Sequence, residues 1–129
     1  MHRAAMVIDD SAMERFLAER VIRNAMFADE VICFNSPLEG LAYLNTLGND
    51  PARFPDVLFV DIHMPLMNGF QFLDEFQHFS NEIKQHCKIV MCSSSIATED
   101  EVRIQKYPTV SKFLTKPLSV EMLENLRAV

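Results

Sequence analysis

The stretch Val57–Val60, VLFV, followed directly by Asp61, decides the fold. Four consecutive apolar residues, rather than apolar residues at alternate positions, are typical of a strand covered on both faces, as in a parallel sheet. Three more short apolar runs occur along the chain, at residues 4–8, 31–34 and 89–92, and a mixed stretch, VSKFL, occupies 110–114. We therefore predict five strands, with the strand that ends at Asp61 in the centre.

Segments with helical periodicity separate these strands, because their apolar residues recur at spacings of three and four. In the first segment, Ser11 is placed as an N-cap and Glu14 as its capping-box partner. The apolar positions of this segment are Met13, Phe16, Leu17 and Val21. Further helices are expected from Pro37 to near Gly48, over 72–79 after Asn68-Gly69, over 98–105 and over 119–126.

Alternating strands and helices of these lengths imply right-handed crossovers. We therefore expect the α/β class, with a (βα)5 doubly wound, five-stranded parallel sheet and helices on both faces. A length of 129 residues leaves room for one domain, which is expected to span residues 1–129. In such a sheet, ligands bind beyond the carboxyl ends of the strands. The residues just after each strand are therefore the candidates for function.

The overall charge argues against two classes of partner. Twelve Lys and Arg against eighteen Asp and Glu give a net charge of −6, the wrong sign for attraction to nucleic acid or to an anionic membrane. No apolar run approaches the ~18 residues that a membrane span needs, so a cytoplasmic location is expected. The cysteines, Cys33, Cys87 and Cys92, form no C-x-x-C pair, and we expect Cys33 and Cys92 to be buried, inert thiols.

Acidic, hydroxyl and basic side chains follow four of the five predicted strands. Asp9 and Asp10 follow the first strand, Asp61 the third, Ser93 the fourth and Lys116 the fifth. Three carboxylates at one rim repel one another unless a cation lies between them, and an all-oxygen site suits Mg²⁺. Lys116 and Ser93 suit the oxygens of a phosphoryl group, and a carboxylate beside Mg²⁺ and Lys can be a nucleophile towards phosphorus. We predict that Asp61 is this nucleophile.

Each of these signals has a simpler explanation when it is taken alone. An aspartate at a strand end is usually a helix cap or a turn residue, a Lys-Pro pair is usually solvated surface, and a run of serines is usually a loop. Their coincidence at the correct ends of four strands is what indicates a site.

With these motifs the sequence resembles the receiver domain of bacterial two-component response regulators, of the stand-alone, chemotaxis-protein-like type. The resemblance covers essentially the whole chain and implies a flavodoxin-like fold. Four motifs carry it, and they are Val7–Asp10, Val60–Pro65 with Gly69 eight residues beyond the aspartate, Val90–Ser94 and Phe113–Pro117.

The resemblance implies a role for each acidic residue. Asp61 would accept a phosphoryl group from a phosphohistidine. Asp10 and, partly through water, Asp9 would hold Mg²⁺ together with Asp61 and the backbone carbonyl of His63. Lys116 would pair with the phosphoryl oxygens, and its bond to the following proline is expected to be cis.

The resemblance also implies a two-state switch. Ser93 would follow the phosphoryl group and Phe113 would turn inward behind it, changing the face made by the fourth helix, fifth strand and fifth helix. Ser93 stands where threonine is more frequent in the family and keeps the hydroxyl. Phe113 stands where tyrosine is commoner and lacks the hydroxyl, so an inward state would depend on packing alone.

The expected partners are proteins. A sensor histidine kinase or a histidine phosphotransfer protein would supply the phosphoryl group, and a downstream protein target would bind the switched face. We expect neither nucleic acid nor membrane as a partner, and a monomer or weak dimer. Because only thirteen residues follow Lys116, an output domain is not expected.

Three other functions compete with this one. A phosphatase of the haloacid-dehalogenase kind would want a second acid two residues after the nucleophile, where His63 stands. An FMN carrier would want a loop without the repelling charges of Asp9 and Asp10. The third alternative is a receiver-fold interaction module that works without phosphorylation. Since any phosphorylation would be self-directed and slow, we expect a signalling switch rather than an enzyme.

Overall fold

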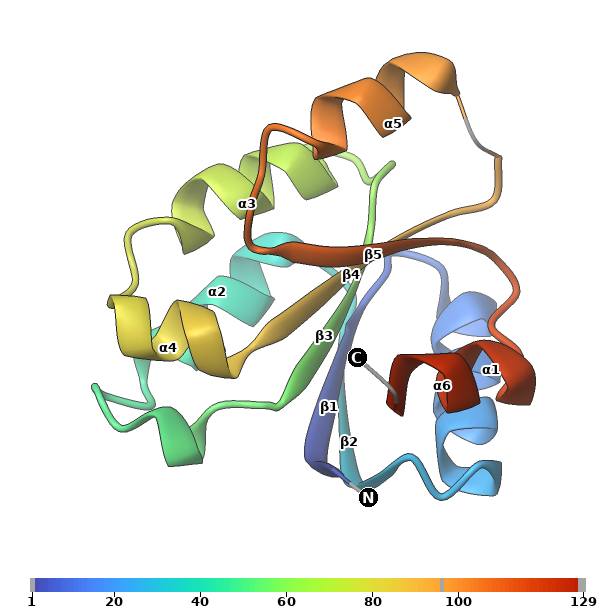
Figure 1. Ribbon diagram of the computed structural model, residues 1–129, viewed down its shortest axis with the longest axis horizontal. Coiled ribbons are helices and arrows are strands. Elements are labelled where there is room, and N and C mark those ends of the chain that lie inside the picture. Colours follow the sequence, from blue (N-terminus) through green and yellow to red (C-terminus); the bar gives the residue numbers. More distant parts are fainter. Residues whose placement is uncertain (1, 96, 128–129) are drawn as a thin grey trace.

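A computed structural model describes residues 2–95 and 97–127 of the chain. Its centre is a five-stranded sheet in the order β2-β1-β3-β4-β5, in which all neighbouring pairs are parallel (Figure 1). The strands are β1 (His2–Ile8), β2 (Ala28–Phe34), β3 (Val57–Asp61), β4 (Lys88–Ser93) and β5 (Val110–Thr115). The five predicted strands and the α/β class are therefore confirmed, and β3 lies in the middle of the sheet.

Helices cover both faces of this sheet. They are α1 (Ala12–Asn24), α2 (Pro37–Asn45), α3 (Gly69–Phe76), α4 (Asn81–His86), α5 (Thr98–Ile104) and α6 (Val120–Arg127), with a short 3₁₀ helix, η1 (Pro51–Arg53). In Figure 1, α1 and α6 lie on one side of the sheet and α2, α3, α4 and α5 on the other. Among the described residues, no helix combines the length and apolar composition that crossing a bilayer requires.

Capping side chains begin the helices at the predicted places. Ser11 accepts a hydrogen bond from the backbone N–H of Glu14, and Ser36 does the same from Glu39. The expected capping box at Ser11 is wrong in one of its two hydrogen bonds. The N–H of Ser11 donates to Oδ1 of Asp9 at 2.9 Å and not to the side chain of Glu14. The first turn of α1 is thus tied to the end of β1.

The structure differs from the sequence pattern in two elements. Helix α4 was not predicted, since it has six residues and one buried side chain, Ile83, too few to produce a periodicity. In α1 the apolar positions Met13 and Phe16 are 72% and 62% exposed, while Ile22 is fully buried. Small and branched side chains on another side of α1 therefore face the sheet, although the helix itself is where the pattern placed it.

Two apolar clusters form the core, one on each face of the sheet. The larger cluster joins β1, β3 and β4 to α2, α3, α4 and α5 and contains Phe54, Phe70, Phe72 and Phe76. The smaller cluster joins the other face to α1 and α6 through Ile22, Phe27, Phe59, Leu123 and Leu126. All five residues of β3 are buried, which accounts for its continuous apolar run.

The cysteines are free thiols that lie mostly inside. Cys87 and Cys92 are buried as expected for Cys92, but Cys33 is only half-buried, with Sγ 3.5 Å from Oε1 of Glu19. Burial and the neighbouring carboxylate raise the pKa of Cys33 to about 11, so this thiol is protonated at neutral pH.

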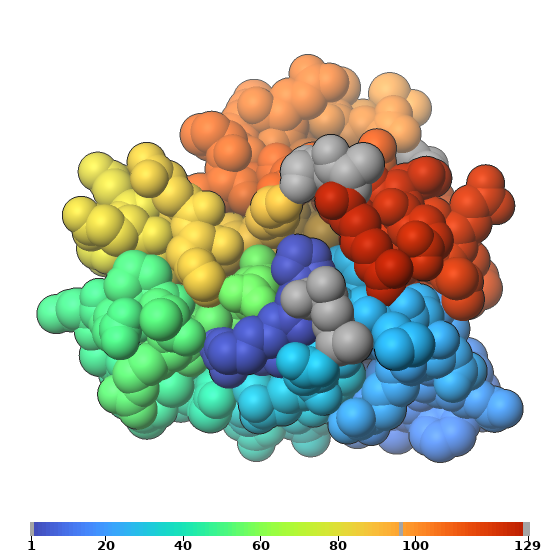
Figure 2. Space-filling model, turned by 60° about the horizontal axis from the view of Figure 1, so that its bottom comes forward, coloured from blue at the N-terminus to red at the C-terminus, as the bar shows by residue number. Residues whose placement is uncertain are grey.

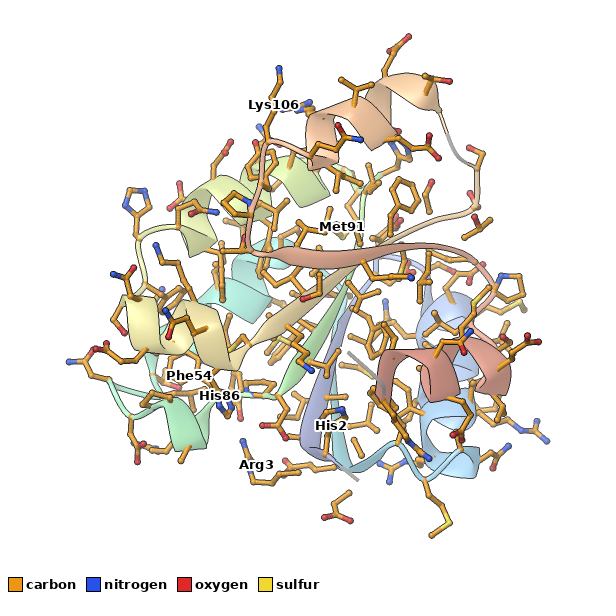
Figure 3. The ribbon with its side chains drawn as sticks, viewed as in Figure 1. His2, Arg3, Phe54, His86, Met91 and Lys106 are labelled. Atoms are coloured by element: carbon orange, nitrogen blue, oxygen red, sulfur yellow. The ribbon has the colours of Figure 1, made fainter. Side chains whose placement is uncertain are left out.

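At the amino ends of the strands, Asp56 joins separate segments of the chain. One carboxylate oxygen accepts from the N–H of Arg3 at 2.7 Å, and the other lies 2.9 Å from Nε2 of His86. The Arg3 guanidinium donates to the carbonyl of Phe54 at 2.8 Å. Figure 3 shows Phe54 and His86 together at this end, and Figure 2 shows this side of the molecule, with the beginning of β1 in dark blue between the neighbouring segments. The polar residues singled out above lie at the opposite end.

Candidate functional site

Two neighbouring strands bring the three carboxylates together. β1 and β3 pair with Ile8 opposite Val60, so Asp9 follows one strand at the level where Asp61 ends the other. The carboxylates of Asp9, Asp10 and Asp61 offer ligand atoms that all lie within 4.8 Å of one another. Asp9 and Asp61 are buried, and Asp10 is exposed. The topology thus assembles the predicted acidic group from residues far apart in the sequence.

Lys116 reaches this group from the other side of β3. It follows the last residue of β5, and its backbone N–H donates to the carbonyl of Ser93 at 2.8 Å. Its Nζ donates to Oδ2 of Asp9 at 2.6 Å and lies 3.4 Å from Oδ1 of Asp61. The Lys116–Pro117 bond is cis, as the resemblance implied. One cation therefore lies between two buried acids.

Burial and charge together set the protonation of the site. Burial raises the pKa of Asp61, and the Asp9 carboxylate raises it further, while the charge of Lys116 acts in the opposite direction. Burial by itself would lower the pKa of Lys116, but the hydrogen bond to Asp9 and the two carboxylate charges outweigh it and raise that pKa. Lys116 is therefore a cation throughout the neutral range.

Each polar group of Asp9 has a partner. Its N–H donates to the carbonyl of Phe34, and its two carboxylate oxygens accept from Ser11 and Lys116. Its carbonyl accepts a 2.8 Å hydrogen bond from Nη1 of Arg15 in α1. Arg15 was not among the predicted site residues, and its position six residues after Asp9 was the one signal in the sequence that pointed to it.

Comparisons with known proteins identify the family. The family model described as the response regulator receiver domain matches residues 5–127. The chain belongs to the response regulator receiver domain family. A two component response regulator from Cytophaga hutchinsonii has a similar structure, with a TM-score of 0.90 and 27% identity over 98% of this chain and 95% of that one.

Two curated relatives contain a matching segment within longer proteins. The protein-glutamate methylesterase/protein-glutamine glutaminase of Treponema pallidum is 32% identical over 120 residues, 92% of this chain but 27% of that protein. The sensor histidine kinase CheAY of Helicobacter pylori is 27% identical over 118 residues, 92% of this chain but 14% of that protein. This receiver domain thus spans less than a third of the length of either relative.

The acidic group of the receiver domain fits a small divalent cation. Three carboxylates within 4.8 Å form an all-oxygen donor set with a charge that one ammonium group leaves uncompensated. Exposed Asp10 leaves the site open to solvent, as a cation that keeps several waters requires. The residues present therefore suit Mg²⁺. Whether the carbonyl of His63 contributes stays a prediction.

The two predicted switch residues of the receiver domain lie on adjacent strands. Ser93, fully buried at the end of β4, donates its hydroxyl hydrogen to the carbonyl of Ser95 at 2.5 Å and accepts from the N–H of Ser95 at 3.2 Å. Phe113 in β5 is half-buried and packs against the larger core cluster. The Ser93 hydroxyl is thus held by the loop that leads towards α5, and its role in a switch stays a prediction.

His63 lies beside the site but its imidazole points elsewhere. Its side chain is 63% exposed, and Nε2 lies 3.4 Å from Oδ2 of Asp100 in α5. The imidazole therefore connects the loop after Asp61 with the first turn of α5, which follows β4 at the same end of the sheet.

Proposed function

We propose that this receiver domain is a magnesium-dependent phosphoacceptor switch in which Asp61 receives a phosphoryl group from a histidine kinase or a histidine phosphotransfer protein. The observation that carries the proposal is the group at the carboxyl end of the sheet, where Lys116 lies between Asp9 and Asp61 and Asp10 completes three carboxylates. We further propose that the domain acts as a stand-alone regulator in the cytoplasm, and that it is a switch and not a turnover enzyme.

The chemistry assigns one task to each side chain. A carboxylate oxygen of Asp61 attacks phosphorus and forms the P–O bond, while the P–N bond of the phosphohistidine breaks and its electron pair returns to the imidazole, which takes up a proton from solvent. Asp9 and Asp10, with Asp61, would hold Mg²⁺, which when bound neutralises charge on the phosphoryl oxygens. Lys116, which is already aimed at Asp61, would pair with a phosphoryl oxygen.

The output of the switch follows from the bond that Ser93 makes in this structure. When the hydroxyl of Ser93 turns towards a phosphoryl oxygen on Asp61, it gives up the carbonyl of Ser95 and frees the loop that leads to α5. The face formed by α5, β5 and α6 then changes, and it carries the exposed apolar side chains of Val102 and Val120. A downstream protein would bind this face.

The test is incubation with acetyl phosphate, with and without Mg²⁺, followed by intact mass spectrometry. We expect a gain of roughly 80 Da, one phosphoryl group, that requires both Mg²⁺ and Asp61 and is absent in Asp61→Ala. The matched control is Asp29→Ala, which removes an exposed carboxylate at the start of β2 and should be phosphorylated like the parent.

Rapid hydrolysis could hide the adduct, so beryllofluoride binding is measured in parallel. Binding of beryllofluoride with Mg²⁺ to the parent and not to Asp61→Ala also supports the proposal. A folded parent that shows neither adduct nor beryllofluoride binding would overturn it and leave the interaction module that works without phosphorylation.

A further inference from the structure

We infer that Arg15 is a positioning residue for the magnesium site, acting through the main chain of Asp9; this inference rests on the function proposed above. Its guanidinium donates from Nη1 to the carbonyl oxygen of Asp9 at 2.8 Å. Arg15 itself contacts none of the carboxylate oxygens of the site within ion-pair distance, so it would act on the ligands through the turn that carries them.

The turn between β1 and α1 explains why this contact is needed. β1 ends at Ile8 and α1 begins at Ala12, so the carbonyl of Asp9 belongs to neither a strand ladder nor a helix. A buried carbonyl without a partner is unfavourable, and Asp9 is 5% exposed. The guanidinium of Arg15 supplies the missing donor from within the first turns of the helix.

The other polar groups of Asp9 show what the contact accomplishes. Its N–H is held by Phe34 of β2, and its carboxylate oxygens are held by the N–H of Ser11 and by Nζ of Lys116. With the carbonyl fixed as well, Asp9 has little freedom to rotate about its backbone. The same peptide plane sets the positions of the nitrogen and Cα atoms of the next residue, Asp10, and so limits where its carboxylate can lie.

The surroundings of Arg15 differ from those of the two arginines that form ion pairs. Arg23 pairs with Glu19 and Arg127 with Glu124, both on exposed helix surface. Within residues 2–95 and 97–127, Arg15 has no carboxylate in ion-pair distance, and its side chain is half-buried. The hydrogen bond from its guanidinium goes to the main chain of Asp9, a residue of the proposed metal site.

This assignment predicts an effect opposite in sign to that of simple electrostatics. Arg15 is a cation near a cation site, so on charge alone its removal should tighten Mg²⁺ binding. If Arg15 holds the ligands in place, its removal should weaken Mg²⁺ binding. Loss of a partner that orients metal ligands typically costs about tenfold or more in metal affinity.

The experiment is calorimetric titration with MgCl₂ alone, without a phosphodonor, on the parent and three variants. Arg15→Met keeps the aliphatic stem and removes the donor, and we expect its Mg²⁺ affinity to fall by about tenfold. Arg20→Met removes the same charge from an exposed position on the same helix and should bind like the parent. Arg15→Lys restores a donor and a charge and should recover most of the affinity.

Each outcome bears on one proposal. Equal or tighter binding by Arg15→Met, or Arg15→Lys as weak as Arg15→Met, would overturn the role of Arg15. A parent that binds no Mg²⁺ would instead overturn the magnesium dependence of the proposed function. Circular dichroism verifies the fold of each variant, and Arg15→Gln, which is also unable to reproduce the guanidinium contact, replaces Arg15→Met if that variant does not fold.

Discussion

Asp61 is placed where an ionised carboxylate is unfavourable before any phosphoryl group arrives. It is 7% exposed, and burial raises its pKa. The attraction of Lys116 exceeds the repulsion from the Asp9 carboxylate but does not cancel the effect of burial. The ionised, unphosphorylated carboxylate of Asp61 therefore lowers the stability of the folded state.

We expect Asp61→Asn to be more stable than the parent at neutral pH without Mg²⁺. The raised pKa means that the folded state binds a proton more tightly than the unfolded state, so the contribution of Asp61 to stability falls as pH rises from its ordinary pKa of 3.8 through the raised value. A gain of about 1 kcal/mol corresponds to about 4 °C in Tm for a chain of this length. Thermal unfolding at pH 7 and at pH 4 measures the difference, which should shrink at the lower pH.

The control is Asp29→Asn, which removes an exposed carboxylate and should leave Tm unchanged. An Asp61→Asn variant that melts below the parent at pH 7 would contradict the expectation.

Gly69 allows the main chain to pass close behind Asp61. A methyl group at this position would lie 2.7 Å from the carbonyl oxygen of Asp61 and 2.7 Å from Cε of Met91. Because the backbone cannot yield easily, we expect Gly69→Ala to lower the free energy of unfolding by about 1 to 3 kcal/mol, measured by urea unfolding.

Gly40→Ala is the matched comparison. Its nearest neighbour, at 2.8 Å, is Cδ1 of Ile8, the flexible end of a side chain, and alanine is favoured over glycine in a helix. We expect a smaller loss than for Gly69→Ala. Equal losses in the two variants would show that close approach to the Asp61 main chain is not the cause.

Among the elements, α5 and the turn after it contact α3 through side chains. Its buried residue is Ile104, and the guanidinium of Arg103 lies 4.2 Å from the ring centre of Phe70. Just beyond the helix, the hydroxyl of Tyr107 donates to Oδ1 of Asp74 at 2.8 Å. Since α3 begins in the loop after Asp61, these contacts connect the site to the proposed output helix.

A double-mutant cycle with Tyr107→Phe and Asp74→Asn should show a coupling of about 0.5 to 1 kcal/mol in the free energy of unfolding. Burial and the hydrogen bond to Asp74 raise the pKa of Tyr107, so this contribution is present below the ordinary tyrosine pKa and is lost as pH rises through the raised value. Asp74→Asn should accordingly lower the pKa of Tyr107, followed by ultraviolet absorbance in a Tyr43→Phe background. An unchanged tyrosine titration would contradict this connection.

The strands and most helices were predictable because their signals are local. Consecutive apolar residues such as Val57–Val60 indicate a strand covered on both faces, and Ser11 marks the start of α1. Helix α4 was missed because one buried residue makes no pattern, and the buried side of α1 was missed because its exposed residues include Met13 and Phe16. The angle at which a helix packs on the sheet decides which side of the helix is buried. The periodicity of the sequence carries no information about this angle.

The candidate site divides in the same way. Residues at strand ends, such as Asp61 and Lys116, could be found because topology alone brings strand ends to one edge. The bond of Arg15 to Asp9 and the turn between Ser93 and Ser95 could not, because they depend on side-chain rotamers and loop geometry.

For the whole molecule, we expect the acidic site to make the free energy of unfolding depend on divalent cations. Mg²⁺ that binds the folded state alone adds RT ln(1 + [Mg²⁺]/Kd), about 2.7 kcal/mol at a hundred times Kd. We therefore expect Tm to rise with Mg²⁺ in the parent and to rise much less in Asp10→Asn, measured by thermal unfolding at constant ionic strength. The control is Asp50→Asn, at the start of η1, which should respond to Mg²⁺ like the parent. A Tm that is independent of Mg²⁺ in the parent would contradict the cation site.

Asp61 ends a fully buried central strand, so the proposed phosphorylation site and the proposed output helix, α5, belong to regions of unequal local stability. Strand β3 is paired on both sides, so we expect it to open only when the whole sheet comes apart. Helix α5 buries one side chain, so we expect it to fray without disturbing the sheet. The phosphoryl group would thus be attached to the part of the protein with the highest local stability. Helix α5, which the downstream protein would bind, would remain free to exchange rapidly between conformations.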